Sequence, residues 1–208
     1  LNRQIETLKT LQAESWEAMK QPKAARRPAL AKEYTEAATA LLQTLDKVST
    51  QLTAAASHMD AVVDQLLAIK QLAWLVRDSG GQAALQLSGA FATGRLPPEA
   101  RQNYTRFITG AEFTWNALEA LVAGLQLPPG LVEAMAAVKS GYFDPQHLSG
   151  SEKLLNAAIA GDKLGLTSGE WRTGAVARLG TAVTLAERAL AEAKRYTTGQ
   201  WTSARRAL

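Results

Sequence analysis

Apolar residues recur along much of the chain at alternating spacings of four and three positions. The longest run comprises Leu41, Leu45, Val48, Leu52, Ala55, Met59, Val62, Leu66, Ile69, Ala73 and Val76. This spacing places apolar side chains on one face of an α-helix, and it is typical of helices that pack nearly parallel or antiparallel. The pattern predicts either one continuous helix from Pro28 to Ser79 or two helices with a break near residues 54–58, where Ser57 is a candidate N-cap.

Upstream, the apolar spacing predicts a first helix that ends near Gln21-Pro22. Beyond Val76, the pair Gly80-Gly81 weakens the pattern, although the spacing stays helical up to Gly94. Further proline- and glycine-containing turns are expected at residues 96–99, 127–130 and 141–145, and each of them separates two helices.

Two later helices carry seams of the same kind, and two capping boxes predict helix starts. The pairs Ser149 with Glu152 and Thr167 with Glu170 fit the capping box, in which each side chain satisfies a free backbone N–H of the first turn. The first predicted seam is Tyr104, Ile108, Ala111, Trp115, Leu118, Val122 and Leu125, and the second is Val176, Leu179, Val183, Ala186, Leu190 and Ala193.

Composition supports an all-α fold. The 208 residues include 39 Ala and 29 Leu against 9 Val and 4 Ile, which favours helix over strand. We therefore expect residues 1–208 to form a single domain. Its architecture is predicted to be an elongated up-and-down bundle of about six or seven helices, three of them long, built as one bundle or as two stacked four-helix-type sub-bundles.

Composition and motifs also exclude several chemistries. The chain has no Cys, so thiolate metal sites, disulfides and a cysteine nucleophile are ruled out. Its two histidines, His58 and His147, are far apart, and no nucleotide-binding or nucleophile-elbow motif is present. We therefore expect no metal, no cofactor and no catalysis in this chain. The net charge of +4 is spread among acidic residues, so no nucleic-acid partner is expected.

One stripe of residues suggests binding chemistry. Lys70, Trp74, Arg77 and Gly81 share a helix face beside the apolar seam. An aromatic wall next to two cations suits a small anion such as a carboxylate, because Arg supplies forked donors and Trp excludes water. The same spacing equally fits a boundary tryptophan beside an arginine that pairs with a neighbouring carboxylate.

Two further tryptophans complete the candidate ligand-binding set. Trp115 occupies a seam position, which favours core packing over ligand contact. Trp171 lies at the start of the last predicted helix, where it can close the end of a bundle or line a cavity. The candidate ligand-binding residues are Lys70, Trp74, Arg77, Trp115 and Trp171.

Four segments carry a resemblance to a known group of domains. They are residues 70–80 (KQLAWLVRDSG), 127–131 (LPPGL), 138–143 (VKSGYF) and 168–171 (SGEW). Over roughly residues 28–195 the chain resembles the all-helical extracytoplasmic sensor regions of bacterial sensor histidine kinases, chemoreceptors and diguanylate cyclases, particularly those of alphaproteobacteria. The resemblance implies a periplasmic bundle that transmits a signal through its first and last helices.

The resulting functional hypothesis is a periplasmic sensor region of an inner-membrane receptor, most favourably a sensor histidine kinase. In this hypothesis the region binds either a small, anionic solute such as an organic acid or a partner, and it forms a homodimer in the full receptor. Because the chain begins within a helical pattern and without Met, we expect it to be part of a longer protein with transmembrane helices outside this sequence. The alternative is a soluble helical scaffold or adaptor that binds a protein partner.

Overall fold

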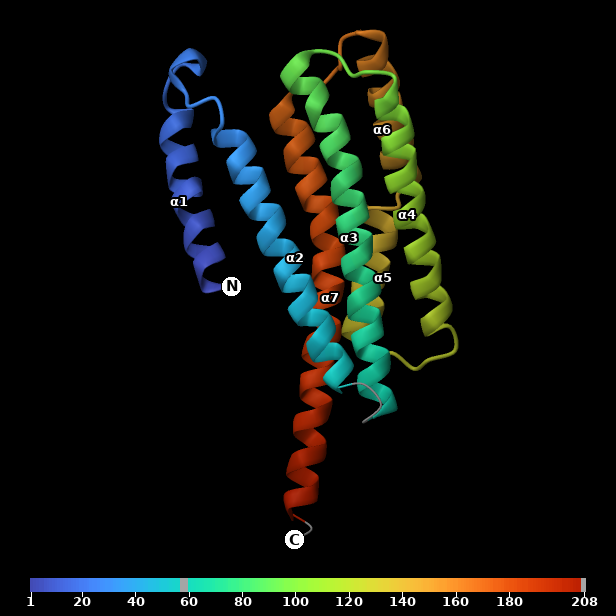
Figure 1. The fold of residues 1–208 in the computed structure, drawn as a ribbon. Helices are drawn as coiled ribbons and strands as arrows, with labels where there is room; N and C mark the ends of the chain where they lie inside the picture. The colour runs from blue at the N-terminus through green and yellow to red at the C-terminus, as the bar shows by residue number, and fades with distance from the viewer. Residues whose placement is uncertain (57–59, 207–208) are drawn as a thin grey trace. The chain divides into compact units, whose positions relative to one another are not determined.

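The computed structural model describes residues 1–56 and 60–206, except for the side chains of residues 23, 56 and 206. Helices and the turns that connect them make up the described residues, which confirms the all-α prediction (Figure 1). Its elements are α1 (Asn2–Met19), the short 3-10 turn η1 (Lys23–Ala25), α2 (Leu30–Ala56), α3 (Ala61–Thr93), α4 (Glu99–Val122), α5 (Pro129–Gly141), α6 (Pro145–Ala160) and α7 (Ser168–Arg206). They group into two compact units, Leu1–Ser57 and His58–Leu208.

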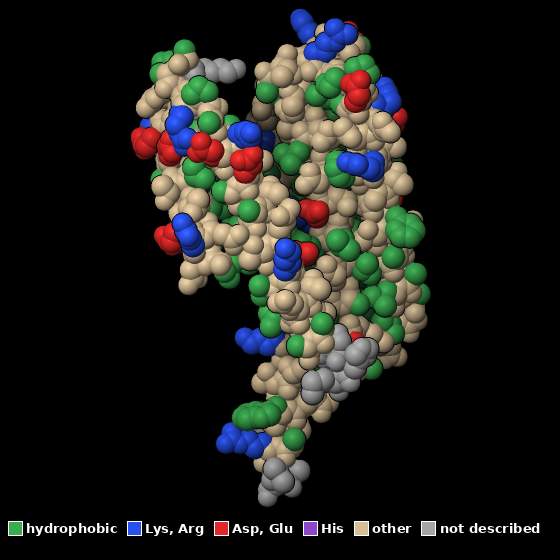
Figure 2. Space-filling model, in the orientation of Figure 1, with side chains coloured by type: hydrophobic (Ala, Val, Ile, Leu, Met, Phe, Trp, Pro, Cys, Tyr) green, Lys and Arg blue, Asp and Glu red, His purple; other side chains and the backbone are tan. Residues whose placement is uncertain are grey.

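The first unit is a hairpin of α1 and α2 whose connecting loop carries a cluster of ion pairs. Arg27, in the connecting loop, pairs with Glu14 of α1 and with Glu33 of α2, each at 2.7 Å. On the visible face of this hairpin, acidic and basic side chains lie next to one another (Figure 2). None of the eighteen residues of α1 is buried. Leu45, Val48 and Leu52 of the predicted seam in α2 are exposed, and Leu52 has 65 % of its surface accessible.

The second unit contains two hydrophobic cores, one above the other along the same three helices. Helices α3, α4 and α7 contribute to both cores. Helix α5 completes the first, which we name the α5 core, and α6 completes the second, the α6 core. This arrangement corresponds to the predicted alternative of two stacked four-helix layers. The largest fully buried side chains are Ile69, Val76, Leu118, Leu131, Val138 and Leu185 in the α5 core and Leu87 and Leu155 in the α6 core.

Helix α3 begins at a well-formed cap, so the long apolar run is two helices. The Asp60 side chain accepts hydrogen bonds from the backbone N–H groups of Val62 at 2.8 Å and Val63 at 3.2 Å. The other candidate N-cap, Ser57, lies outside the described residues. Gly80 and Gly81 do not interrupt α3, which continues to Gly94, where the backbone turns left-handed at φ 75°.

The two predicted capping boxes have opposite outcomes. Thr167 and Glu170 form theirs: the Thr167 N–H donates to Glu170 Oε2 at 2.7 Å, and the Glu170 N–H donates to Thr167 Oγ1 at 3.2 Å. The Ser149 box is wrong, because α6 begins four residues earlier, at Pro145. There the Asp144 side chain accepts from the backbone N–H of His147 at 2.9 Å and caps the helix.

The predicted seams are confirmed in α3 and α4 but are shifted in α7. Leu66, Ile69, Ala73 and Val76 of α3 are buried, as are Tyr104, Ala111, Trp115 and Leu118 of α4. In α7, two predicted seam residues, Val176 and Leu190, are exposed. The face that α7 buries comprises Ala182, Leu185, Ala186, Ala189 and Ala193, of which only Ala186 and Ala193 belong to the predicted seam. Small side chains therefore let α7 approach its neighbours closely.

Candidate functional site

The predicted stripe on α3 places two of its members in contact. The guanidinium of Arg77 lies 5.5 Å from the centre of the Trp74 ring, in a cation–π arrangement. Gly81 leaves room for the Arg77 side chain, whose Nη1 lies 3.5 Å from where a Cβ at that glycine would stand. Lys70 donates to the side chain of Gln71 at 3.4 Å. The binding role of this stripe stays a prediction.

Trp115 lies inside the α5 core, with 5 % of its surface exposed and its ring centre 5.3 Å from that of Phe143. Burial against another aromatic ring is typical of a core-packing residue, which is the role that the apolar spacing in the sequence favoured for Trp115.

Trp171 lies in the α6 core, and its ring stacks on Phe91 at 6.4 Å between centres. Its indole N–H donates to Ser88 Oγ at 3.1 Å, so the ring is fixed in orientation. The five predicted residues thus do not converge on one site: Trp74 and Arg77 meet on α3, whereas Trp115 and Trp171 belong to different cores.

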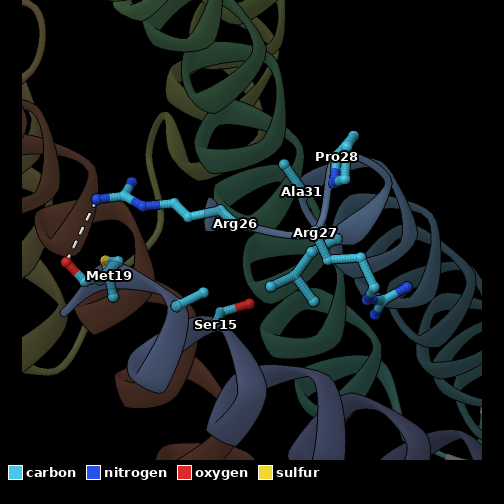
Figure 3. A pocket seen from close by; sticks show the side chains of 8 residues that line it. Ser15, Met19, Arg26, Arg27, Pro28 and Ala31 are labelled. Carbon is cyan, nitrogen blue, oxygen red and sulfur yellow. Dashed lines mark hydrogen bonds between the residues drawn. The ribbon is translucent and has the colours of Figure 1, made fainter. Parts of the chain in front are cut away.

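The charged groups that line two of the cavities already have partners. A cavity of about 340 Å³ lies between the end of α1, the connecting loop and the start of α2 (Figure 3). Its lining includes Ser15, Met19, Arg26, Arg27, Pro28 and Ala31. Arg27 is held by its two glutamates, and Arg26 donates to the carbonyl oxygens of Met19 and Gln21. A cavity of about 220 Å³ at the end of the α5 core contains the ion pair of Arg195 with Glu192, at 2.7 Å.

A third cavity, of about 460 Å³, has a different character. This α6–α7 pocket is lined by α7 residues one turn apart, facing residues of α6 with the same helical spacing. The α7 side is Glu170, Trp171, Gly174 and Arg178, and the α6 side includes His147, Gly150, Ser151 and Leu154. Asp144, Gln146 and Leu166 complete the wall. One predicted residue, Trp171, therefore lines a cavity together with an arginine.

Arg178 is the cation of this pocket. Its Nη1 lies 2.7 Å from where a Cβ at Gly174 would stand, so the side chain folds back by one helical turn over the glycine. Among the described residues, no carboxylate lies within the 4.0 Å of an ion pair with Arg178. A half-buried guanidinium without an internal partner is suited to binding a carboxylate from a ligand through two parallel hydrogen bonds.

His147 faces Arg178 as a neutral side chain. Burial and, to a smaller extent, the charge of Arg178 lower the pKa of His147 from its ordinary value of 6.5 to about 4, against the opposing effect of Asp144. The ring lies 6.0 Å from that of Tyr142 in an edge-on arrangement. At neutral pH this histidine therefore supplies a hydrogen-bonding group without a charge.

The two carboxylates of the pocket take part in helix capping, Asp144 as the N-cap of α6 and Glu170 in the capping box of α7, and both have spare acceptor capacity. Asp144 uses Oδ2 to cap α6, and Glu170 uses Oε2 to accept from both the N–H and the hydroxyl of Thr167. These two hydrogen bonds lower the pKa of Glu170, so it is ionised at neutral pH. Within the described residues, Asp144 Oδ1 and Glu170 Oε1 accept no hydrogen bond.

The described residues contain no cluster of three or more His, Asp or Glu side chains placed to hold a metal ion. None of the described helices combines the length and apolarity needed to cross a membrane. No family model, no curated protein and no solved structure matches this chain.

The neutral state of His147 makes stability depend on pH. The pKa of His147 is lower in the folded chain than in the unfolded chain. Its contribution to the free energy of unfolding is therefore fully present above about pH 6.5 and is lost as the pH falls towards about 4. Solvent screening at this half-buried side chain limits the loss to about 1–2 kcal/mol. Urea titrations of the His147→Gln variant between pH 7.5 and 4.5 are expected to show a shallower loss of stability than those of the parent chain. Equal pH profiles for the two proteins would contradict this assignment.

Proposed function

We propose that this chain is a non-catalytic ligand-binding module, the extracytoplasmic sensor region of a bacterial transmembrane receptor. A sensor histidine kinase is the receptor class that we favour. The ligand is a small solute with a carboxylate group, and it binds in the α6–α7 pocket. The observation that carries the proposal is Arg178, whose guanidinium borders a cavity beside Trp171 and has no ion-pair partner among the residues that the structure describes.

The helix architecture supports a route for the signal. Helix α7 carries Trp171 and Arg178 in its first turns, then continues through the α5 core to Ala193 and beyond as one 39-residue helix. A ligand that draws α6 and α7 together therefore acts on a rod that extends past both cores. Such a ligand shifts an equilibrium between two helix positions by the difference in its affinity for them. In the proposed receptor, two copies of the chain associate and α7 leads towards the membrane.

A second candidate function rests on the exposed face of α2. Leu45, Val48 and Leu52 follow the heptad spacing, yet all three are exposed. A scaffold or adaptor that packs a partner helix on this face would use these residues. Such a protein forms a complex through α2 and does not respond to small carboxylates, which separates it from the sensor.

Arg178→Gln is expected to weaken binding of small carboxylates by about tenfold to a hundredfold. A charge-assisted hydrogen bond contributes about 1.5–3 kcal/mol, and 1.4 kcal/mol corresponds to a factor of ten. The measurement is isothermal titration calorimetry with acetate, propanoate and 4-methylpentanoate, after a thermal-shift screen of the same compounds. The matched control is Arg172→Gln, which changes an exposed arginine of the same helix outside the pocket. Equal affinities in the parent and Arg178→Gln would refute the proposed site.

A further inference from the structure

We infer that the ligand of the α6–α7 pocket is a zwitterion of the α-amino acid class, whose carboxylate binds Arg178 and whose ammonium group binds Glu170 and Asp144. The inference rests on the proposed function, because it specifies the chemistry of a ligand for the same pocket. The inference also goes beyond the proposed function, since a simple organic acid offers a group only to Arg178 and none to the two carboxylates.

The charges of the pocket argue against a simple anion. One guanidinium stands against two carboxylates, and the neutral His147 adds no positive charge. A ligand with only a carboxylate gains from Arg178 but is repelled by Asp144 and Glu170. A ligand that also carries an ammonium group offers three N–H donors, and each pocket carboxylate has an oxygen that accepts nothing within the described chain.

Arg178 and Glu170 lie on the same face of α7, and both line the pocket. Arg178 folds back over Gly174, so its guanidinium lies closer to Glu170 along the helix than its own backbone does. An α-amino acid carries its two charged groups on adjacent carbons, so a ligand of this class can turn its carboxylate to the guanidinium and its ammonium group to the pocket carboxylates. Gly174 is required for this geometry, because a side chain at that position would occupy the place of the guanidinium.

The remaining wall of the pocket favours an apolar side chain on the ligand. Trp171, Leu154 and Leu166 line the cavity. Polar and charged side chains make up more of the lining than these three apolar ones, and about 460 Å³ lies within the usual size range of small-molecule sites. Amino acids with side chains such as those of leucine and phenylalanine are therefore the expected ligands.

The test uses compounds that differ by one charged group. L-leucine, 4-methylpentanoate and 3-methylbutylamine share a carbon skeleton but carry both charges, only the carboxylate or only the ammonium group. L-phenylalanine, 3-phenylpropanoate and 2-phenylethylamine form a second set. Calorimetry on the 208-residue chain is expected to show at least one amino acid binding ten times or more as tightly as either of its single-charge analogues.

Two variants distinguish this inference from the proposed function. Asp144→Asn with Glu170→Gln removes both negative charges, while Asn and Gln retain the capping hydrogen bonds and so preserve α6 and α7. We expect this double variant to lose the preference for the amino acid and to retain binding of the carboxylate analogue, whereas Arg178→Gln loses both. Glu187→Gln, an exposed site on α7 away from the pocket, is the control for charge alone.

The outcomes that overturn the inference are distinct from those that overturn the function. If the carboxylate analogues bind as tightly as the amino acids, the inference fails and the proposed function stands. If the double variant retains the full amino acid preference, the assignment of the ammonium site fails. If no compound of either set binds to the parent chain, both the inference and the proposed function fail.

Discussion

Replacing Trp115 by alanine is expected to lower the free energy of unfolding by about 3–5 kcal/mol, the usual cost of deleting a large aromatic side chain from a packed core. The Trp115 ring is 5 % exposed and contacts Phe143 within the α5 core. Chemical denaturation followed by circular dichroism at 222 nm measures the change. Trp115→Phe, which retains most of the apolar area, is expected to lose clearly less.

The matched control lies two residues away on the same helix. Phe113 is 75 % exposed, so Phe113→Ala is expected to change the free energy of unfolding by no more than about 0.5 kcal/mol. If Trp115→Ala also proved to be nearly neutral, Trp115 would not be a core residue. In that case its predicted role as a ligand-binding residue would gain weight.

Replacing Gly80 by alanine is expected to destabilise the chain by about 1–3 kcal/mol, although alanine is the better helix former. A Cβ at Gly80 would stand 2.6 Å from Tyr142 Cζ and 2.9 Å from Leu179 Cδ2. Tyr142 is buried and cannot swing aside. Gly80 thus allows α3 to lie directly against the end of α5 and against α7.

Alanine at the neighbouring Gly81 is expected to have the opposite effect. A Cβ at Gly81 would meet only the flexible side chain of Arg77, at 3.5 Å. Gly81→Ala is therefore expected to be neutral or to stabilise the chain by about 0.5–1 kcal/mol through helix propensity. Thermal melts of the two single variants compare them directly. A rise in Tm for Gly80→Ala, or a loss of several degrees for Gly81→Ala, would be inconsistent with the packing around α3.

Helix positions were largely predictable from the sequence because apolar period and helix-terminating residues are local signals. The seams of α3 and α4, the capping box at Thr167 and the end of α3 at Gly94 all depend on residues within a few turns of one another. Where two local signals competed, the sequence did not decide between them. Asp144 followed by Pro145 and the pair Ser149 with Glu152 are both acceptable helix starts, and the structure uses the first.

The buried face of α7 was not predictable from residue size. Val176 and Leu190 are larger than the alanines that α7 buries, yet they point to solvent. In an alanine-rich helix, the buried face depends on how closely the neighbouring helices approach, which is a tertiary property. The exposed seam of α2 has a similar cause, since an apolar spacing shows that a face can be buried without showing what covers it.

The candidate site was predictable only in part. Trp171 stood out in the sequence because it follows a capping box at the start of a helix. Arg178 and His147 did not, because the sequence does not show that residues of α6 and of the first turns of α7 line the same pocket. The signal that could have found Arg178 is its spacing from Trp171 and Gly174, which puts the three residues on one face of α7. The stripe at Lys70, Trp74 and Arg77 carries the same chemistry on α3, and it remains a competing prediction.

The most direct test of the proposed site follows the indole N–H resonances of Trp171 and Trp74 by two-dimensional NMR. Trp171→Phe and Trp74→Phe assign the two signals, and L-leucine and 4-methylpentanoate are the titrants. We predict that the Trp171 indole signal shifts in a saturable way in the parent chain and not in Arg178→Gln, while the Trp74 signal stays in place. A saturable shift of the Trp74 signal with an unchanged Trp171 signal would contradict the account and place the ligand on α3.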